Sequence, residues 1–273
     1  MKIVFCFFTS LFVFIGCSLT TRPRIQFLEV RSFGEAYIPS QKTIAVLEQR
    51  TKIVISGEYV LYIKPFVKTR SKLSFDKGGN VAGQKEVSRD TTFNVFASRK
   101  HKQNGLKYTL DNFRNEQGQI ISIDSMLNTS GFGDDVYSTF DYDLGKPDNV
   151  VMNGKKRVEK YFIRKQSYAE PDSIYRYYDE ALTDIRFSFS KKLDKKQRSK
   201  LYKTVFVMNK IPKNVVLPDT EIPRRESWND LRRIDEKNPA LYLEIIEKFK
   251  KDYKSHGLDK QATKTAITKY GIE

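Results

Sequence analysis

The sequence predicts an α+β fold: a mainly antiparallel, curved β-sheet or partial barrel of about nine to eleven strands, followed by a helical C-terminal tail. Three observations lead to this fold class. Apolar and polar residues alternate with a period of two over most of residues 25–217. The runs are joined by short turns, which favour antiparallel pairing because parallel strands need long crossovers. Beyond Pro212, Pro218 and Pro223, the apolar residues change to helical spacing.

The first long run covers residues 53–63, where apolar side chains occupy both odd and even positions. This pattern predicts a single long, buried strand that bends at Gly57. A following strand ends near Phe75, and the Asp-Lys-Gly-Gly-Asn sequence at residues 76–80 predicts a turn.

Two Asn-Gly pairs, Asn104-Gly105 and Asn153-Gly154, lie between runs of alternating apolar residues. Asn-Gly is the strongest short-range signal for a hairpin, because both residues tolerate the positive φ that a tight turn requires. Each pair therefore predicts a β-hairpin. Residues 115–118, Asn-Glu-Gln-Gly, predict a further turn between them.

Later runs of β-branched and aromatic residues complete the predicted sheet. Strands are expected at residues 119–123, 136–144, 173–178, 184–190 and 201–208. The last two are expected to pair as a hairpin, with a basic loop at residues 191–200 between them.

The helical tail begins with a short helix predicted at residues 227–234. The main helix follows Asn238-Pro239, an N-cap residue with proline at the first helical position, and Gly257 predicts its end. A third helix is predicted from Asp259 to Tyr270. The main helix carries an apolar stripe that we expect to pack on the sheet, formed by Tyr242, Ile245, Ile246, Phe249 and Tyr253.

The N-terminus follows the pattern of a secretory leader. Lys2 supplies a positive charge, and residues 3–16 form an apolar run shorter than the roughly 20 residues that span a bilayer. Residues 14–17, Phe-Ile-Gly-Cys, resemble the lipobox of bacterial lipoproteins, with Phe14 where leucine is usual. The resemblance covers only the leader. It implies cleavage before Cys17 and lipid, such as palmitate, on that cysteine; an ordinary leader cut after Ser18 and an uncleaved anchor are the alternatives.

The expected organisation is a lipoprotein signal peptide at residues 1–16, a lipidated tether at 17–24, a β-rich domain at 25–217 and a helical tail at 218–273 packed on that domain. The chain contains two cysteines, Cys6 and Cys17. Removal of the leader would leave Cys17 alone. A single thiol forms neither an intramolecular disulfide nor a cysteine-based zinc site.

The chain is strongly basic, with 49 Lys and Arg against 33 Asp and Glu and a formal net charge of +16. A basic surface favours anionic partners. Export argues against nucleic acid, so the expected partners are the membrane itself, anionic lipid head groups, acidic glycans or an envelope protein. The alternative is a basic surface that is simply solvated.

Catalytic signatures are weak. The two histidines, His101 and His256, lie in no metal-ligand spacing and are expected to be exposed, and the sequence has no nucleophile elbow or phosphate-binding glycine loop. Asp141 and Asp143 share one parity of a predicted strand, which would suit a hard cation or a glycosidase pair. We expect no cofactor and no catalytic or metal site.

Two basic clusters are the candidate residues for contact with an anionic surface. One flanks the Asn104-Gly105 turn, and the other occupies the loop expected at residues 191–200. If both loops project from one end of the sheet, they form a single cationic rim; alternatively, they are solvated tips whose lysines discourage edge pairing. The candidates are Arg99, Lys100, Lys102, Lys107, Lys191, Lys192, Lys195, Lys196, Arg198 and Lys200.

The sequence thus predicts a lipid-anchored, non-enzymatic binding or accessory lipoprotein of a bacterial cell envelope, with the outer membrane favoured over the inner. The predicted curved sheet with a helical cover resembles lipoprotein carriers and lipocalin-like domains in architecture only. Two alternatives remain: a structural subunit of an envelope machine or outer-membrane protein complex, and a carboxylate-dependent envelope hydrolase.

Overall fold

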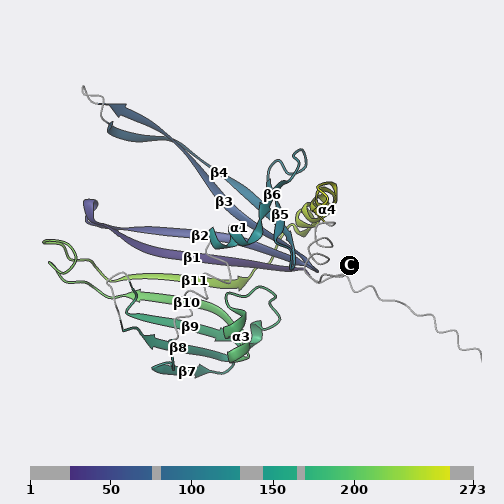
Figure 1. Cartoon of the computed structure of the whole chain (residues 1–273). Coiled ribbons are helices and arrows are strands. Elements are labelled where there is room, and N and C mark those ends of the chain that lie inside the picture. The colour runs from purple at the N-terminus through teal and green to yellow at the C-terminus, as the bar shows by residue number, and fades with distance from the viewer. Residues whose placement is uncertain (1–24, 76–80, 130–143, 165–169, 259–273) are drawn as a thin grey trace, which may run out of the picture.

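A computed structural model of the chain describes residues 25–75, 81–129, 144–164 and 170–258 (Figure 1). These residues contain a single open, curved sheet of eleven strands in the order β6-β5-β4-β3-β2-β1-β11-β10-β9-β8-β7, and every pairing is antiparallel. The sheet is followed by a helix at the C-terminal side. The predicted α+β fold class is confirmed.

The first half of the sheet is built from consecutive hairpins and includes one short α-helix. Its elements are β1 (Gln26–Ile38), the 3₁₀ turn η1 (Pro39–Gln41), β2 (Thr43–Ser56), β3 (Tyr59–Phe75), β4 (Val81–Arg99), β5 (Asn104–Thr109), β6 (Gln119–Ser122) and α1 (Ile123–Thr129). β3 and β4 are the longest strands, and together they extend as a two-stranded ribbon beyond the rest of the sheet (Figure 1).

The second half forms the other end of the sheet and then supplies the long helix. Its elements are β7 (Asn149–Asn153), β8 (Lys156–Phe162), β9 (Ser173–Asp179), η2 (Glu180–Leu182), α3 (Lys191–Gln197), β10 (Lys200–Met208), β11 (Arg225–Arg233) and α4 (Pro239–Ser255). The two halves join where β1 pairs with β11, with Val30 opposite Leu231.

The run at residues 53–63 folds as a hairpin, so the prediction of one long strand is wrong. Ser56 pairs with Tyr59 across a two-residue loop, in which Gly57 has φ +58°. Cross-strand partners share a face, so Ile53 lies beside Tyr62 on one face of the sheet. After the loop, even-numbered residues lie on the face that odd-numbered residues occupy before it. Because both faces are buried here, the residues on both sides of the loop are apolar, and the sequence does not reveal the turn.

Each face of the sheet carries its own hydrophobic cluster. One cluster packs α4 against strands β2 to β5, with Val54, Leu61 and Leu106 among the buried strand residues. The other cluster packs strands from both halves against residues 185–193, with Leu28 and Leu231 at the junction between the halves. Helix α1 adds half-buried side chains to this second cluster.

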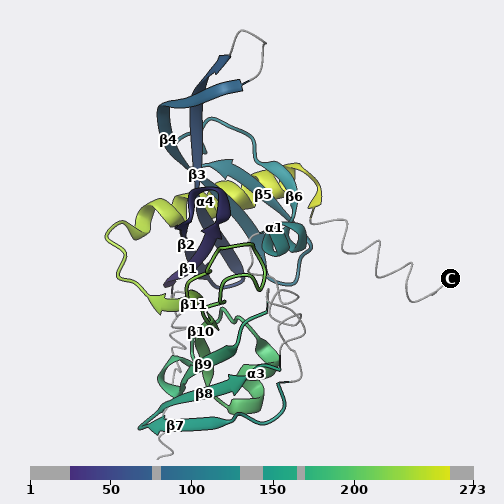
Figure 2. The ribbon, with the colours of Figure 1, turned by 90° about the vertical axis from the view of Figure 1, so that its left-hand side faces the viewer.

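Helix α4 begins and ends where the sequence predicts. The Asn238 side chain accepts a hydrogen bond from the Leu241 N–H, Pro239 is the first helical residue, and Gly257 has φ +68° just beyond the end. The apolar stripe of this helix is buried as expected. Figure 2 shows the helix lying across one face of the first half of the sheet.

Two predictions for the second half are wrong. Residues 227–234 were expected to be helical, but β11 occupies this segment because it pairs on both sides, with β1 and with β10. Residues 184–190 form no strand, and the loop expected at 191–200 contains the helix α3. Ser190 caps this helix by accepting from the Leu193 N–H, and Arg198 ends it with φ +51°.

The Asn153-Gly154 hairpin is confirmed as β7–β8, with Gly154 at φ +58°. The Asn104-Gly105 hairpin exists, but its turn lies earlier, at residues 100–103, and both Asn104 and Gly105 belong to β5. The leader with Cys17, the turn at 76–80, the acidic segment with Asp141 and Asp143, and the helix expected at 259–270 lie outside the described residues. So does the strand expected at 136–144, except for Leu144.

Candidate binding cleft

The two basic clusters of the sequence meet at one cleft of about 620 Å³. The first cluster supplies Arg99 from the end of β4 and Lys100 and Lys102 from the turn that follows it, and the second supplies Lys191 from the start of α3. A volume of this size lies within the range of about 300–1,000 Å³ that is typical of small-molecule sites. The clusters are about 90 residues apart in the sequence, so only the folded sheet brings them together.

The β4–β5 turn forms one side of the cleft. The Lys100 N–H donates to the Glu58 carbonyl at 2.7 Å, which ties this turn to the neighbouring β2–β3 loop, and His101 has φ +62°. Arg99 Nε donates to a Glu58 carboxylate oxygen at 2.7 Å, and this hydrogen bond lowers the pKa of Glu58. Arg99 is therefore held in place at the edge of the cleft.

Helix α1 forms a second wall, and Gly105 allows it to approach the sheet. A Cβ atom on Gly105 would lie 2.4 Å from the Ala97 carbonyl oxygen and 2.5 Å from Ile123 Cδ1. The Ile123 N–H donates to the Gln103 carbonyl at 2.8 Å. Glycine at this position is thus required by close packing rather than by positive φ, and the packing places Asp124 and Leu127 at the cleft.

The third wall is the irregular segment before α3. Arg186 Nη1 donates to the Gly57 carbonyl at 2.9 Å, and the rings of Phe187 and Phe189 pack edge to face with centroids 5.6 Å apart. Beneath this segment, Lys200 Nζ donates to Asp194 at 2.7 Å and to the Phe187 carbonyl at 3.1 Å. This buried ion pair fixes the wall against β10.

The cleft combines an apolar floor with a cationic rim. The floor is formed by side chains of the second hydrophobic cluster, namely Ile55, Val60, Tyr62 and Phe187, together with Ile123 and Leu127 of α1. Among the described residues, the rim carries five Lys and Arg side chains, with His101 between them and one lining carboxylate, Asp124. Such an arrangement can hold a ligand that is negatively charged at one end and apolar at the other.

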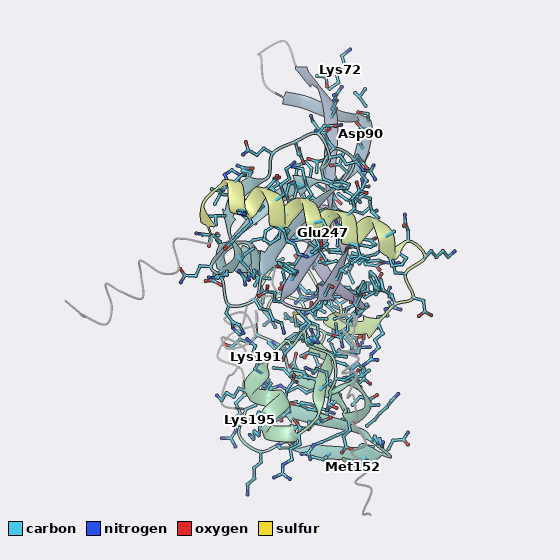
Figure 3. The ribbon with its side chains drawn as sticks, turned by 90° about the vertical axis from the view of Figure 1, so that its right-hand side faces the viewer. Lys72, Asp90, Met152, Lys191, Lys195 and Glu247 are labelled. Atoms are coloured by element: carbon cyan, nitrogen blue, oxygen red, sulfur yellow. The ribbon has the colours of Figure 1, made fainter. Side chains whose placement is uncertain are left out.

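The remaining candidates lie elsewhere. Lys107 is half-buried within β5, and Lys200 is buried in the ion pair with Asp194. Lys192, Lys195, Lys196 and Arg198 are exposed on or beside α3 and do not line the cleft. Figure 3 shows Lys191 and Lys195 on this helix.

Sequence reasoning missed several residues of the cleft. Arg186 and Phe187 were assigned to a strand that does not form. Tyr62 was assigned to a single long strand, which would place it on the opposite face of the sheet from Ile53 and Ile55. The charge of Arg186, next to the basic run that follows it, was a signal that could have placed it with the second cluster. Asp124 had no signal in the sequence, because α1 was not predicted.

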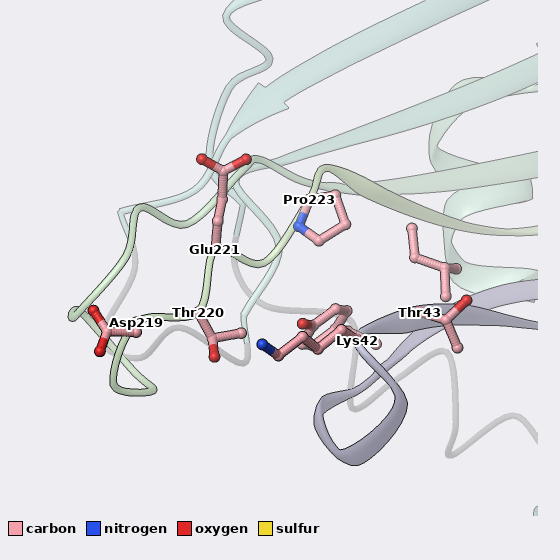
Figure 4. Close-up of a pocket in the computed structure, with 8 residues that line it drawn as sticks. Lys42, Thr43, Asp219, Thr220, Glu221 and Pro223 are labelled. Atoms are coloured by element: carbon pink, nitrogen blue, oxygen red, sulfur yellow. The ribbon is translucent and has the colours of Figure 1, made fainter.

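A second cavity, of about 310 Å³, lies between the β1–β2 turn and the loop before β11. Its lining includes Lys42 on one side and Asp219 and Glu221 on the other, and the Lys42 side chain points toward the loop (Figure 4). Opposite charges thus face each other across this cavity. Because it has neither a uniform charge nor an extended apolar wall, it is the weaker candidate for a ligand site.

The histidines occupy different environments. His101 is exposed at the rim of the cleft, whereas His256 is half-buried at the end of α4, with Nε2 2.9 Å from the Gly118 carbonyl oxygen, so the prediction that His256 is exposed is wrong. Within the described residues, no group of three or more His, Cys, Asp or Glu side chains is arranged to hold a metal ion.

None of the helices in the described part of the chain combines the length and the apolar character needed to cross a lipid bilayer. No protein-family model matches the chain, and no curated protein matches it.

Proposed function

We propose that the protein is a lipid-anchored, non-enzymatic binding lipoprotein of a bacterial cell envelope, with the outer membrane favoured over the inner, and that the cleft is its binding site. The observation that carries the proposal is the convergence of Arg99, Lys100, Lys102 and Lys191 with Arg186 around an apolar floor. A cleft with walls of low dielectric and one dominant charge concentrates anionic ligands.

The position of the chain entry supports a tethered role. β1 begins at Gln26, whose side chain donates to the Asp184 carbonyl at 2.8 Å and accepts from the Arg186 N–H. Arg186 lines the cleft, so the N-terminal strand enters the fold beside the binding site. About nine residues separate Cys17 from Gln26, and a chain of this length spans at most about 30 Å. A lipid on Cys17 would therefore keep the cleft close to the membrane.

Substitution of the two cysteines tests the anchor. We expect Cys17→Ala to abolish incorporation of a radiolabelled fatty acid and to move the protein from the membrane fraction to the soluble fraction. Cys6→Ala is the matched control, since it removes the other cysteine within the leader, and it should change neither result. Membrane retention of Cys17→Ala, with no fatty-acid label on the wild type, would contradict the proposed anchor.

A structural subunit of an envelope complex is the second candidate, and two exposed apolar surfaces favour it. On the β3–β4 ribbon, Phe66 and Val87 are more than half exposed, and on the edge strand β7, Val151 and Met152 are too. Crosslinking in cells distinguishes the candidates: a photoreactive side chain at Val151 or Phe66 should trap one stoichiometric protein only if the protein is such a subunit.

A further inference from the structure

We infer that the cleft binds one molecule of a single-chain anionic amphiphile, with its head group, such as a phosphate, on the cationic rim and its acyl chain on the apolar floor. This inference rests on the proposed binding function and names its ligand class. It depends on the chemistry of the lining residues, on the size of the cleft and on its position beside the entry of the chain.

The rim supplies the complement to an anionic head group. Five Lys and Arg side chains line the cleft, and Asp124 is the single carboxylate among the described lining residues. Arg99 is fixed in an ion pair with the Glu58 carboxylate, which offsets its charge, and the Arg186 guanidinium donates to the Gly57 carbonyl. A fixed guanidinium is well suited to phosphate oxygens because little conformational freedom is lost on binding.

The floor supplies the complement to an acyl chain. A free inorganic anion would need only the rim, but the lining of the cleft also includes the apolar side chains of Val60, Tyr62 and Phe187, and Leu127 of α1. These floor side chains belong to the hydrophobic cluster of the sheet, and Phe187 is only 8% exposed. Each methylene group that leaves water for such a surface tightens binding about fourfold.

The location of the cleft favours a ligand supplied by a membrane. Gln26, the first residue of β1, contacts the same segment that carries Arg186 and Phe187. If Cys17 is lipidated, Gln26 stays within about 30 Å of the bilayer, since that is the reach of the intervening chain, and the cleft lies beside the segment that Gln26 contacts. Single-chain amphiphiles exchange from a bilayer over such distances without crossing a large aqueous gap.

Calorimetric titration of the full chain carrying Cys17→Ala, purified without detergent, tests the inference independently of the anchor. The probes are dodecyl phosphate, decyl phosphate, dodecyl maltoside and inorganic phosphate, each below its micelle concentration where one exists. We expect one dodecyl phosphate per chain, with decyl phosphate about 16-fold weaker because it lacks two methylene groups. Dodecyl maltoside and inorganic phosphate should each bind at least tenfold more weakly.

Paired charge reversals locate the head group. Lys100→Glu with Lys102→Glu should weaken dodecyl phosphate binding at least tenfold. Lys195→Glu with Lys196→Glu changes the net charge equally, but both residues are exposed and neither lines the cleft, so binding should stay within about twofold. Figure 3 shows Lys195 one helical turn beyond Lys191. Both double variants keep the apolar residues 3–16. Any binding of dodecyl phosphate to these leader residues would therefore be the same in the two variants.

Three results would overturn the inference. Inorganic phosphate could bind as tightly as dodecyl phosphate, which indicates a free-anion site, or dodecyl maltoside could do so, which indicates that the rim takes no part. The two paired charge reversals could also weaken dodecyl phosphate binding equally, which indicates attraction to net charge alone. Each leaves fatty-acid labelling of Cys17 untouched. The ligand class and the anchor can therefore fail separately.

Discussion

The two faces of the sheet are covered in different ways. On one face the 17-residue helix α4 supplies a continuous apolar stripe, and its residues Ile245, Ile246 and Phe249 are at most 2% exposed. On the other face the cover consists of two seven-residue helices, α1 and α3, and the irregular segment at residues 183–190. The discontinuous cover leaves the 620 Å³ cleft between its pieces.

A polar network further secures the α4 face. Asp252 accepts hydrogen bonds from Tyr108 Oη and from the Gly118 N–H, both at 3.2 Å, and from Lys248 Nζ at 2.5 Å. Burial and the neighbouring Asp252 raise the pKa of Tyr108. The contrast teaches that one sheet can use a long helix to build stability on one side and short elements to leave room for a ligand on the other.

The largest expected effect comes from truncating a core ring on each face. Phe249→Ala removes a ring that packs against Tyr59 and Tyr253, and it should cost about 3–5 kcal/mol of unfolding free energy. Phe187→Ala should cost less, about 1–3 kcal/mol, because Phe187 lines the cleft and is 8% exposed, whereas Phe249 is 1% exposed. Urea unfolding measures both values; equal costs would remove the distinction between the faces.

A smaller effect is expected where α1 meets the sheet. Gly105→Ala forces a Cβ atom against a backbone carbonyl, so we expect a loss of about 1–3 kcal/mol and weaker binding of dodecyl phosphate. Gly34→Ala is the matched control in another strand, since the added Cβ would lie 3.9 Å from Ser227 Cβ, an ordinary contact. That variant should stay within about 0.5 kcal/mol of the wild type. Equal stability of both variants would refute the close approach of α1.

The smallest effect concerns pH. Burial opposes ionisation of Asp252, but the hydrogen bonds from Lys248, Gly118 and Tyr108 outweigh it and lower the pKa of this carboxyl. A lowered folded-state pKa gives stability that is present above the unfolded value of about 4 and is lost as the pH falls through the folded value. Asp252→Asn should thus be about 1–2 kcal/mol less stable than the wild type at pH 7.

This difference should shrink as the pH falls below about 4, because the unfolded wild type then binds a proton that the folded Asp252 carboxylate still resists, and the advantage is gone once the pH reaches the lowered folded pKa. Urea unfolding at pH 7 and near pH 3 measures the change. Glu247 lies on the exposed side of the same helix (Figure 3). The difference in unfolding free energy between Glu247→Gln and the wild type should therefore change little between the two pH values. If Asp252→Asn keeps a constant deficit at both pH values, the network does not depend on an ionised Asp252.

The elements that local sequence signals define were predicted well. Helix α4 has a cap at Asn238, a proline at its first position and a glycine beyond its end, all within the helix and its flanks. The antiparallel sheet followed from short turns between alternating runs. Predictions failed where distant pairing decides the structure: β11 forms a strand because β1 and β10 flank it, and nothing within residues 225–233 reveals those partners.

The candidate cleft was predictable only in part. Both basic clusters were visible as local runs of charge. Whether the two clusters lie together depends on how distant strands pair, and the sequence does not show this. The floor was hidden for a different reason. Val60 and Tyr62 lie on the same face as Ile53 and Ile55 only because the Gly57-Glu58 turn brings even-numbered residues to the face that odd-numbered residues occupy before it. A run in which both odd and even positions are apolar gives no sign of such a turn.

The pairing of β1 with β11 has a consequence for how the chain folds. Residues 28–34 lie beside residues 227–233, so a loop of nearly 200 residues must close before the halves of the sheet join. Contacts of such long sequence separation form slowly. Trp228, the single tryptophan of the chain, stacks on Phe33 at this junction with ring centroids 5.3 Å apart. Its fluorescence should therefore report when residues 28–34 meet residues 227–233, late in folding and only after residue 228 has been synthesised.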